Sequence, residues 1–158
     1  MGSLGYAVME DLDRHIVSLL AQEGRMSFAD LGRRTGLSTS AVHQRVKRLE
    51  QRGVITGYRA VIDFEQVGLP LTALIALSPF DPAAPDDIPQ RLEHLPQICS
   101  CWSVAGRESY VIQVRLGKPS DLEALLAEIR ATANCGSSST VVLSTPWENR
   151  PVELPRSS

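Results

Sequence analysis

Residues Phe28 to Gln51 read FADLGRRTGLSTSAVHQRVKRLEQ, a pattern that predicts two short helices joined by a tight turn. The first helix is expected to end at Gly36, since glycine adopts the left-handed backbone conformation without a steric cost. Ser38 is a natural N-cap, because its hydroxyl can accept a hydrogen bond from an amide in the first turn. The second helix then begins at Thr39 and meets no breaker before Gly53. The order of these signals is that of a helix-turn-helix motif, running from Phe28 to Lys47.

The second helix has an apolar face and a polar, basic face. Val42, Val46 and Leu49 recur at i, i+4 and i+7, so they are expected to pack inward. The opposite face carries side chains that can bond to base edges or phosphates in a major groove. The expected DNA contacts are Thr39, Ser40, His43, Gln44, Arg45, Lys47, Arg48, Gln51, Arg52 and Arg59. The alternative is a solvated helix face that binds nothing.

The chain has 158 residues, of which 43% are apolar and 22% charged, as in ordinary globular proteins. Its net charge of −2 hides an uneven distribution. Asp11 to Asp63 carries nine Lys or Arg and six Asp or Glu, a balance of +3, whereas the remainder to Ser158 is at −4. A basic N-terminal half can contact the phosphate backbone of double-stranded DNA. No apolar run reaches membrane-spanning length, so we expect a cytoplasmic protein with no membrane partner.

Beyond Phe64, strand and helix patterns alternate. Strands are expected at 69–77, 98–104, 110–116 and 137–144, and helices around Ile88 to Leu95 (ended by Pro96) and Leu122 to Ile129. This βαββαβ order predicts a ferredoxin-like sandwich, with two helices on one face of an antiparallel sheet. The other face would stay uncovered and apolar, which predicts a homodimer.

These patterns divide the chain into five parts. We expect a disordered N-terminus at 1–10, the helix-turn-helix domain at 11–53, a β-linker at 54–68, an effector-binding and oligomerisation domain at 69–145, and a C-terminal tail at 146–158. Gly53 to Asp63 is interpreted as a turn and a β-segment, forming a wing or a linker strand. The cysteines Cys99, Cys101 and Cys135 are expected to be reduced and to pack as small apolar residues. The sequence indicates no catalytic residue, metal site or cofactor.

With these motifs in place, the chain resembles the Lrp/AsnC (feast/famine) transcriptional regulators of bacteria and archaea over nearly its whole length. The resemblance is carried by LDR near the start, the Gly24-Arg25 turn, GLS before the recognition helix, RVKRLE inside it and GVITGY after it. It implies an α+β protein with an N-terminal helix-turn-helix (winged-helix-like) domain and a C-terminal βαββαβ ferredoxin-like (RAM/ACT-like) regulatory domain. It further implies a two-fold dimer that reads a pseudo-palindrome, and assembly of dimers into an octamer.

The resemblance also implies a small effector, usually an amino acid, at the hairpin between the second and third strands of the C-terminal domain. The corresponding residues here are Ser103, Ala105, Gly106, Arg107, Glu108, Ser109 and Tyr110. Three residues after the glycine, where many members carry Asp, this chain has Ser109. A serine is a weaker, neutral partner for an α-ammonium than a carboxylate. The alternative for this stretch is a solvated hairpin tip.

A second function of a different class is a haem-precursor decarboxylase, since some of these enzymes are similar to this architecture. Such an enzyme needs a tetrapyrrole pocket with basic or histidine side chains. His94 is the only histidine of the C-terminal half, and Arg107 is the only basic residue of the hairpin. The cationic face of the recognition helix has no use in such an enzyme, so the sequence favours the regulator.

Overall fold

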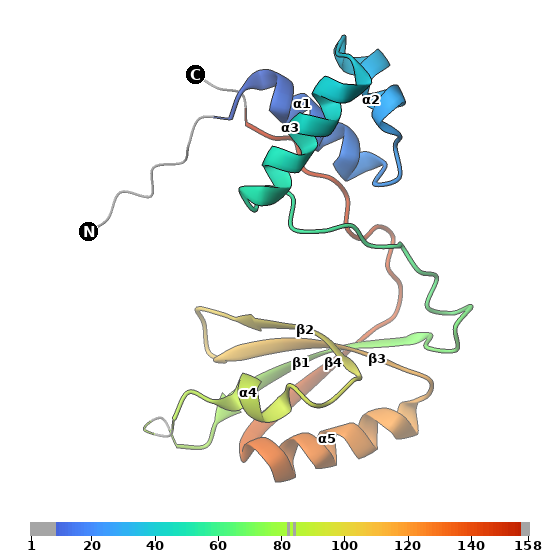
Figure 1. The fold of residues 1–158 in the computed structure, drawn as a ribbon. Helices are drawn as coiled ribbons and strands as arrows, with labels where there is room; N and C mark the ends of the chain where they lie inside the picture. Colours follow the sequence, from blue (N-terminus) through green and yellow to red (C-terminus); the bar gives the residue numbers. More distant parts are fainter. Residues whose placement is uncertain (1–8, 82, 84, 156–158) are drawn as a thin grey trace. The chain divides into compact units, whose positions relative to one another are not determined.

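The structure is a computed structural model that describes residues 9–81, 83 and 85–155, and it divides into two compact units (Figure 1). The first unit joins the N-terminal part, up to Val61, with the C-terminal segment from Trp147 onward, and the second unit is Ile62–Pro146. Of the expected disordered N-terminus, 1–10, residues 1–8 lie outside the described residues. Within the described part of that segment, the Glu10 carboxylate is ion-paired with Arg45 at 2.9 Å.

The first unit contains three helices, α1 (Asp11–Gln22), α2 (Phe28–Thr35) and α3 (Thr39–Gln51). Gly36 ends α2 with φ of 73°, and Ser38 caps α3 by accepting a hydrogen bond from the Ala41 amide. The predicted bounds of α2 and α3 are therefore confirmed. The local signals succeed because each acts within a few residues of the helix end that it determines.

Apolar side chains from all three helices form one small core. It consists of Ile16, Leu19, Leu20, Met26, Leu31, Val42, Val46 and Leu49. Gly32 in α2 allows the turn to come close, since a Cβ atom there would lie 2.6 Å from the Leu37 carbonyl oxygen. Phe28, at the start of α2, is 37% exposed and is not part of this core.

The segment that follows α3 is not a strand. The β-segment expected at Gly53 to Asp63, with the wing or linker strand that it would form, is a wrong prediction, because no strand is found between α3 and β1 (Leu71–Pro79). Val54 and Ile55 pack on the helical core, and Val61 is 96% exposed. A strand requires a neighbour for its backbone hydrogen bonds, and the described part of this single chain supplies none here.

The second unit is an antiparallel sheet with helices on one face (Figure 1). After β1, its elements are α4 (Ile88–Leu92), β2 (Ile98–Ser103), β3 (Tyr110–Leu116), α5 (Pro119–Ala133) and β4 (Cys135–Val142). The strand order is β2-β3-β1-β4, so the ferredoxin-like βαββαβ arrangement is confirmed. The sequence predicts a helix from Ile88 to Leu95, ended by Pro96. The corresponding helix, α4, stops at Leu92, and Leu95 packs in the core from the turn that follows.

The two faces of the sheet differ in character. On the helix side, Ala73, Ile75, Ile112 and Val114 are fully buried under α4 and α5. The opposite face, which we call the outer face, carries apolar side chains among polar ones. Its apolar members are Leu74, Ala76, Trp102, Val111 and Val142. Leu74 and Trp102 are 37% and 46% exposed, so this face resembles a surface that is covered in an assembly.

The C-terminal segment returns to the first unit. Arg14 of α1 donates a hydrogen bond to the backbone carbonyl of Pro155, and residues 151–154 line a hollow with Ser18 and Gln22 of α1. The segment expected as a C-terminal tail, 146–158, therefore packs from Trp147 onward with the unit that carries the helix-turn-helix. Among the described helices, none combines the length and the apolar character needed to cross a membrane.

Candidate functional site

The face of α3 opposite the core is solvent-exposed and basic. Thr39, Ser40, His43, Gln44, Lys47, Arg48, Gln51 and Arg52 are all exposed on α3 or at its end, and Arg59 is exposed in the segment beyond it. Ser40 lies 3.2 Å from the Ser38 hydroxyl at the start of the helix. The His43 ring packs on the Phe28 ring of α2, with a centroid separation of 5.2 Å. The structure thus brings nine of the ten predicted DNA contacts to the surface.

Arg45 differs from the other nine. Its guanidinium donates hydrogen bonds to Glu10 at 2.9 Å and to Asp13 at 2.6 Å, and only 24% of the side chain is exposed. The bonds to Glu10 and then Asp13 raise the pKa of Arg45 above its ordinary value. The Arg45 head group is therefore turned toward α1 and bonded to two carboxylates, unlike the other nine expected DNA contacts.

Asp13, the partner of Arg45, was missed from the sequence. It is buried, with a side chain 2% exposed, and its second carboxylate oxygen lies 3.7 Å from Arg48. The missed signal is positional, because Asp13 stands at i, with Ile16 and Leu20 at i+3 and i+7 of the same apolar stripe. A carboxylate in that position requires a cation from a neighbouring element, and α3 supplies two.

The β2–β3 hairpin borders a cavity of about 450 Å³ in the second unit. All seven residues predicted to bind the effector line it: Ser103, Ala105, Gly106, Arg107, Glu108, Ser109 and Tyr110. The opposite wall is made by Pro79, Pro85, Asp86 and Ile88, which the sequence did not indicate. The Val104 amide donates to the Ser109 carbonyl within the hairpin, and the Ser109 amide donates to the Leu77 carbonyl of β1, each at 3.0 Å.

Two side chains connect the walls of this hairpin cavity. The Tyr110 hydroxyl donates a hydrogen bond to an Asp86 carboxylate oxygen. That hydrogen bond, followed by burial, raises the pKa of Tyr110 to about 12, so its phenol stays protonated as a donor at neutral pH. The structure therefore places a carboxylate in the cavity from outside the hairpin, although the position expected to supply one holds Ser109.

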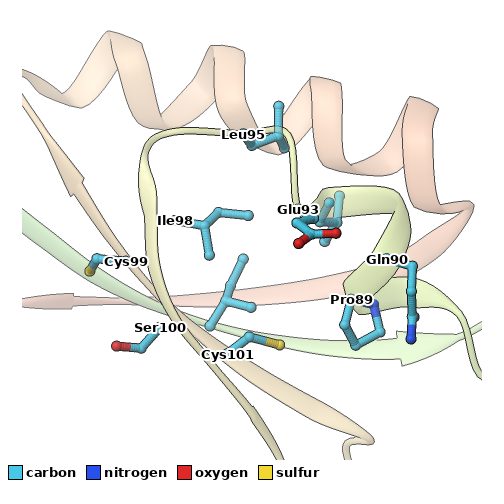
Figure 2. A pocket seen from close by; sticks show the side chains of 10 residues that line it. Pro89, Gln90, Glu93, Leu95, Ile98, Cys99, Ser100 and Cys101 are labelled. Carbon is cyan, nitrogen blue, oxygen red and sulfur yellow. The ribbon is translucent and has the colours of Figure 1, made fainter. Parts of the chain in front are cut away.

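A second hollow, of about 440 Å³, lies between α4 and β2 (Figure 2). Its lining includes Leu95 and Ile98, with Glu93 and Cys101 also facing it. Cys101 and Cys99 are exposed, which contradicts their expected role as packing residues, whereas Cys135 is buried as expected. None of the predicted site residues lines this hollow, and His94, the histidine that a tetrapyrrole site would need, lines neither of these two cavities.

Comparisons with known proteins agree with this arrangement of domains. The model of the AsnC-type helix-turn-helix domain matches residues 9–50, and that of the Lrp/AsnC ligand binding domain matches residues 72–152. The HTH-type transcriptional regulator LrpA of Mycobacterium tuberculosis is 50% identical over 142 residues, which cover 90% of this chain and 95% of that protein.

Solved structures of relatives have the same fold. The crystal structure of M. tuberculosis LrpA matches with a TM-score of 0.83 at 49% identity, covering 92% of this chain and all of that one. A feast or famine regulatory protein of M. tuberculosis complexed with L-methionine matches with a TM-score of 0.89 at 49% identity, covering 92% and 99%. A Neisseria meningitidis regulator in complex with L-methionine matches at 0.83 and 25% identity, covering 94% and 97%. The chain belongs to the Lrp/AsnC family of helix-turn-helix transcriptional regulators.

Proposed function

We propose that the protein is a cytoplasmic homodimeric regulator that reads DNA with α3 and responds to a free amino acid bound beside the β2–β3 hairpin. The observation that carries the DNA-binding part is the exposed basic face of α3, opposite a fully buried apolar stripe. An α-helix that presents such a face beside a tight turn fits a major groove.

The exposed residues divide into two roles by reach and chemistry. Ser40, Gln44 and Lys47 lie on the side of α3 opposite the core, where hydrogen bonds to base edges give sequence preference. Arg52 and Arg59 lie beyond the helix end, where cations bind phosphates of any sequence. Thr39, His43, Arg48 and Gln51 extend the same surface. Arg45 takes a third role, since its bonds to α1 hold the recognition helix in place.

The outer face of the sheet is the proposed dimer interface. The patch that contains Leu74, Trp102 and Val111 would pack against the same patch of a second copy, as a two-fold axis requires. Covering the half-exposed Leu74 and Trp102 removes apolar surface from water, which is the main drive for such association. A dimer presents two recognition helices to successive major grooves. Further assembly of dimers into an octamer is part of the proposal and rests on the family resemblance.

The amino-acid effector is supported by the cavity at the hairpin. Gly106 lines it, does not adopt a positive φ, and a Cβ atom there would meet nothing within 4 Å. Neither the backbone conformation nor the packing of this chain therefore requires glycine at position 106. The absence of a side chain there is consistent with a role in leaving space for a ligand. Two relatives were solved with L-methionine. The effector can alter regulation only if it binds one assembly or DNA-bound form better than another.

The test is a titration of the purified protein against the DNA upstream of its own gene, at two salt concentrations, with and without a panel of amino acids. We expect site-specific, salt-sensitive binding that one amino acid alters. Gln44→Ala should weaken binding at particular base pairs by about 1–3 kcal/mol, while Arg52→Ala should weaken binding to all sequences about equally. If the protein binds the upstream DNA no more tightly than random DNA in every condition, the proposal of a sequence-specific regulator is refuted. If both variants lose affinity equally on every sequence, the assignment of Gln44 to bases and Arg52 to phosphates is refuted.

A further inference from the structure

The hairpin cavity holds both signs of charge on different elements. Asp86 comes from the loop before α4, whereas Arg107 and Glu108 come from the hairpin. Asp86 is exposed, but one of its carboxylate oxygens accepts a hydrogen bond from the hydroxyl of Tyr110, a residue only 6% exposed at the start of β3, and this bond orients the carboxylate. A carboxylate has about four acceptor positions, so this bond leaves most of its capacity for a ligand.

The hairpin itself does not supply an equally well-placed anion. Ser109 is neutral, and its backbone is used on both sides, accepting from Val104 and donating to Leu77 at 3.0 Å. Glu108 is half-buried beside it, but no described contact fixes its side chain. Asp86 is thus the carboxylate in the cavity whose orientation is determined before a ligand arrives, and preorganised groups bind with a smaller entropic cost.

We infer that Asp86 binds the ammonium group, and Arg107 the carboxylate, of a free α-amino acid in this cavity. The inference rests on the proposed function, because it identifies the ligand contacts of the effector site. An ammonium donates up to three hydrogen bonds, and a charge-assisted bond to a fixed carboxylate is about twice as strong as a neutral one. Arg107 offers the planar fork that matches a carboxylate, and it is exposed at the hairpin tip. Many members of the family carry Asp within the hairpin, where this chain has Ser109. The carboxylate of this cavity comes instead from Asp86 in the loop before α4.

The experiment is calorimetric titration of the full-length protein with L-methionine as the probe, followed by other common amino acids. Asp86→Asn should weaken binding by about 10- to 100-fold, the loss expected of one hydrogen bond to a charged group. Asp87→Asn is the matched control, because it makes the same change one residue along the chain. Asp87 is paired with Arg91 at 2.9 Å and does not line the cavity. The control should bind within about threefold of the unchanged protein, a factor below the tenfold that corresponds to about 1.4 kcal/mol.

A second probe separates recognition from folding. The deaminated analogue, which has a hydroxyl in place of the ammonium, should bind the unchanged protein more weakly by a similar factor. The same analogue should lose little further affinity on Asp86→Asn, because the partner of that carboxylate is already missing from the ligand. This comparison on the unchanged protein needs no variant to fold, so equal affinity for L-methionine and its deaminated analogue overturns the inference.

The outcomes also distinguish this inference from the proposed function. If amino acids bind but Asp86→Asn binds them as well as the unchanged protein does, the role of Asp86 is refuted and an effector-responsive regulator stands. If no common amino acid binds, both the inference and the effector half of the proposed function are refuted. DNA recognition by α3 is decided separately by the titration against the upstream sequence.

Discussion

Replacing Asp13 should destabilise the DNA-binding unit far more than replacing any exposed carboxylate of that unit. Asp13 is buried and accepts a 2.6 Å hydrogen bond from Arg45, so Asp13→Asn removes a charge-assisted bond from a largely dry site. Breaking a fully buried ion pair costs about 3–5 kcal/mol, and one hydrogen bond to a charged group contributes about 1.5–3 kcal/mol. The Arg45 side chain is 24% exposed and would still be ion-paired with Glu10 in the variant. The range for a single hydrogen bond to a charged group therefore applies, rather than the range for a fully buried ion pair. We expect about 2 kcal/mol.

The contact between Asp13 and Arg48 adds little to this figure. It spans 3.7 Å, and the Arg48 side chain is 51% exposed, so solvent screens most of the attraction. A loss of about 2 kcal/mol in a unit of this size corresponds to a fall of about 8–16 °C in its unfolding temperature. Urea unfolding of the full-length chain, followed by far-ultraviolet circular dichroism, measures the free energy directly if the slope against urea stays unchanged.

The matched control is Asp11→Asn in the same helix. The Asp11 side chain is 85% exposed and lies 3.8 Å from Arg14, so its loss should change stability by less than about 0.5 kcal/mol. If Asp13→Asn also falls within about 0.5 kcal/mol of the unchanged protein, the buried pair does not hold α1 and α3 together. The structural role given to Arg45 would then be withdrawn as well.

Three further predictions follow from other parts of the structure. Arg45→Gln should leave the salt dependence of DNA binding unchanged, whereas a true phosphate contact would lower the logarithmic slope by about one per protomer. Leu74→Asp on the outer face should shift the protein toward monomers in sedimentation equilibrium, while the same change at the 96% exposed Val61 should not. Tyr110, whose pKa is raised to about 12 from an unfolded value of about 10, adds stability that is present below pH 10 and is lost as pH rises through 12. Difference absorbance of tyrosinate against Asp86→Asn should show that pKa falling toward 10, and an unchanged titration would contradict the Tyr110–Asp86 bond.

The sequence predicts the helix-turn-helix well because its signals are local. Gly36 and Ser38 determine the end of α2 and the start of α3 through their own backbone and side chain, so no distant residue is needed. The strands of the second unit are recognised for a related reason, since continuous apolar runs bounded by turns indicate buried strands. The segment after α3 shows the limit of the method. Its β-type residues pack on helices or stay in solvent, and pairing with a neighbour decides whether a strand forms.

The parts of the candidate sites that the sequence missed depend on long-range contacts. Asp13 meets Arg45 across 32 positions of the chain, and Asp86 meets Tyr110 across 24. In both pairs one member was already a predicted site residue, but its partner carried no motif of its own. A buried or cavity-facing carboxylate is identified only when the packing of two elements is known.

The return of the C-terminal segment to α1 has a consequence for how the protein is made. Residues 11–51 are synthesised before the sheet domain, but Pro151 to Leu154 and the Pro155 carbonyl that complete their unit are synthesised only after it. The helical core can form early, since all of its buried side chains lie between Ile16 and Leu49. The C-terminal segment packs against α1 only after it has been synthesised. During that interval α1 presents an open surface to the nascent chain, so the sheet domain must fold without occupying it. A tag fused after Pro155 would likewise be tethered beside the DNA-binding helices, so fusion partners are better placed elsewhere.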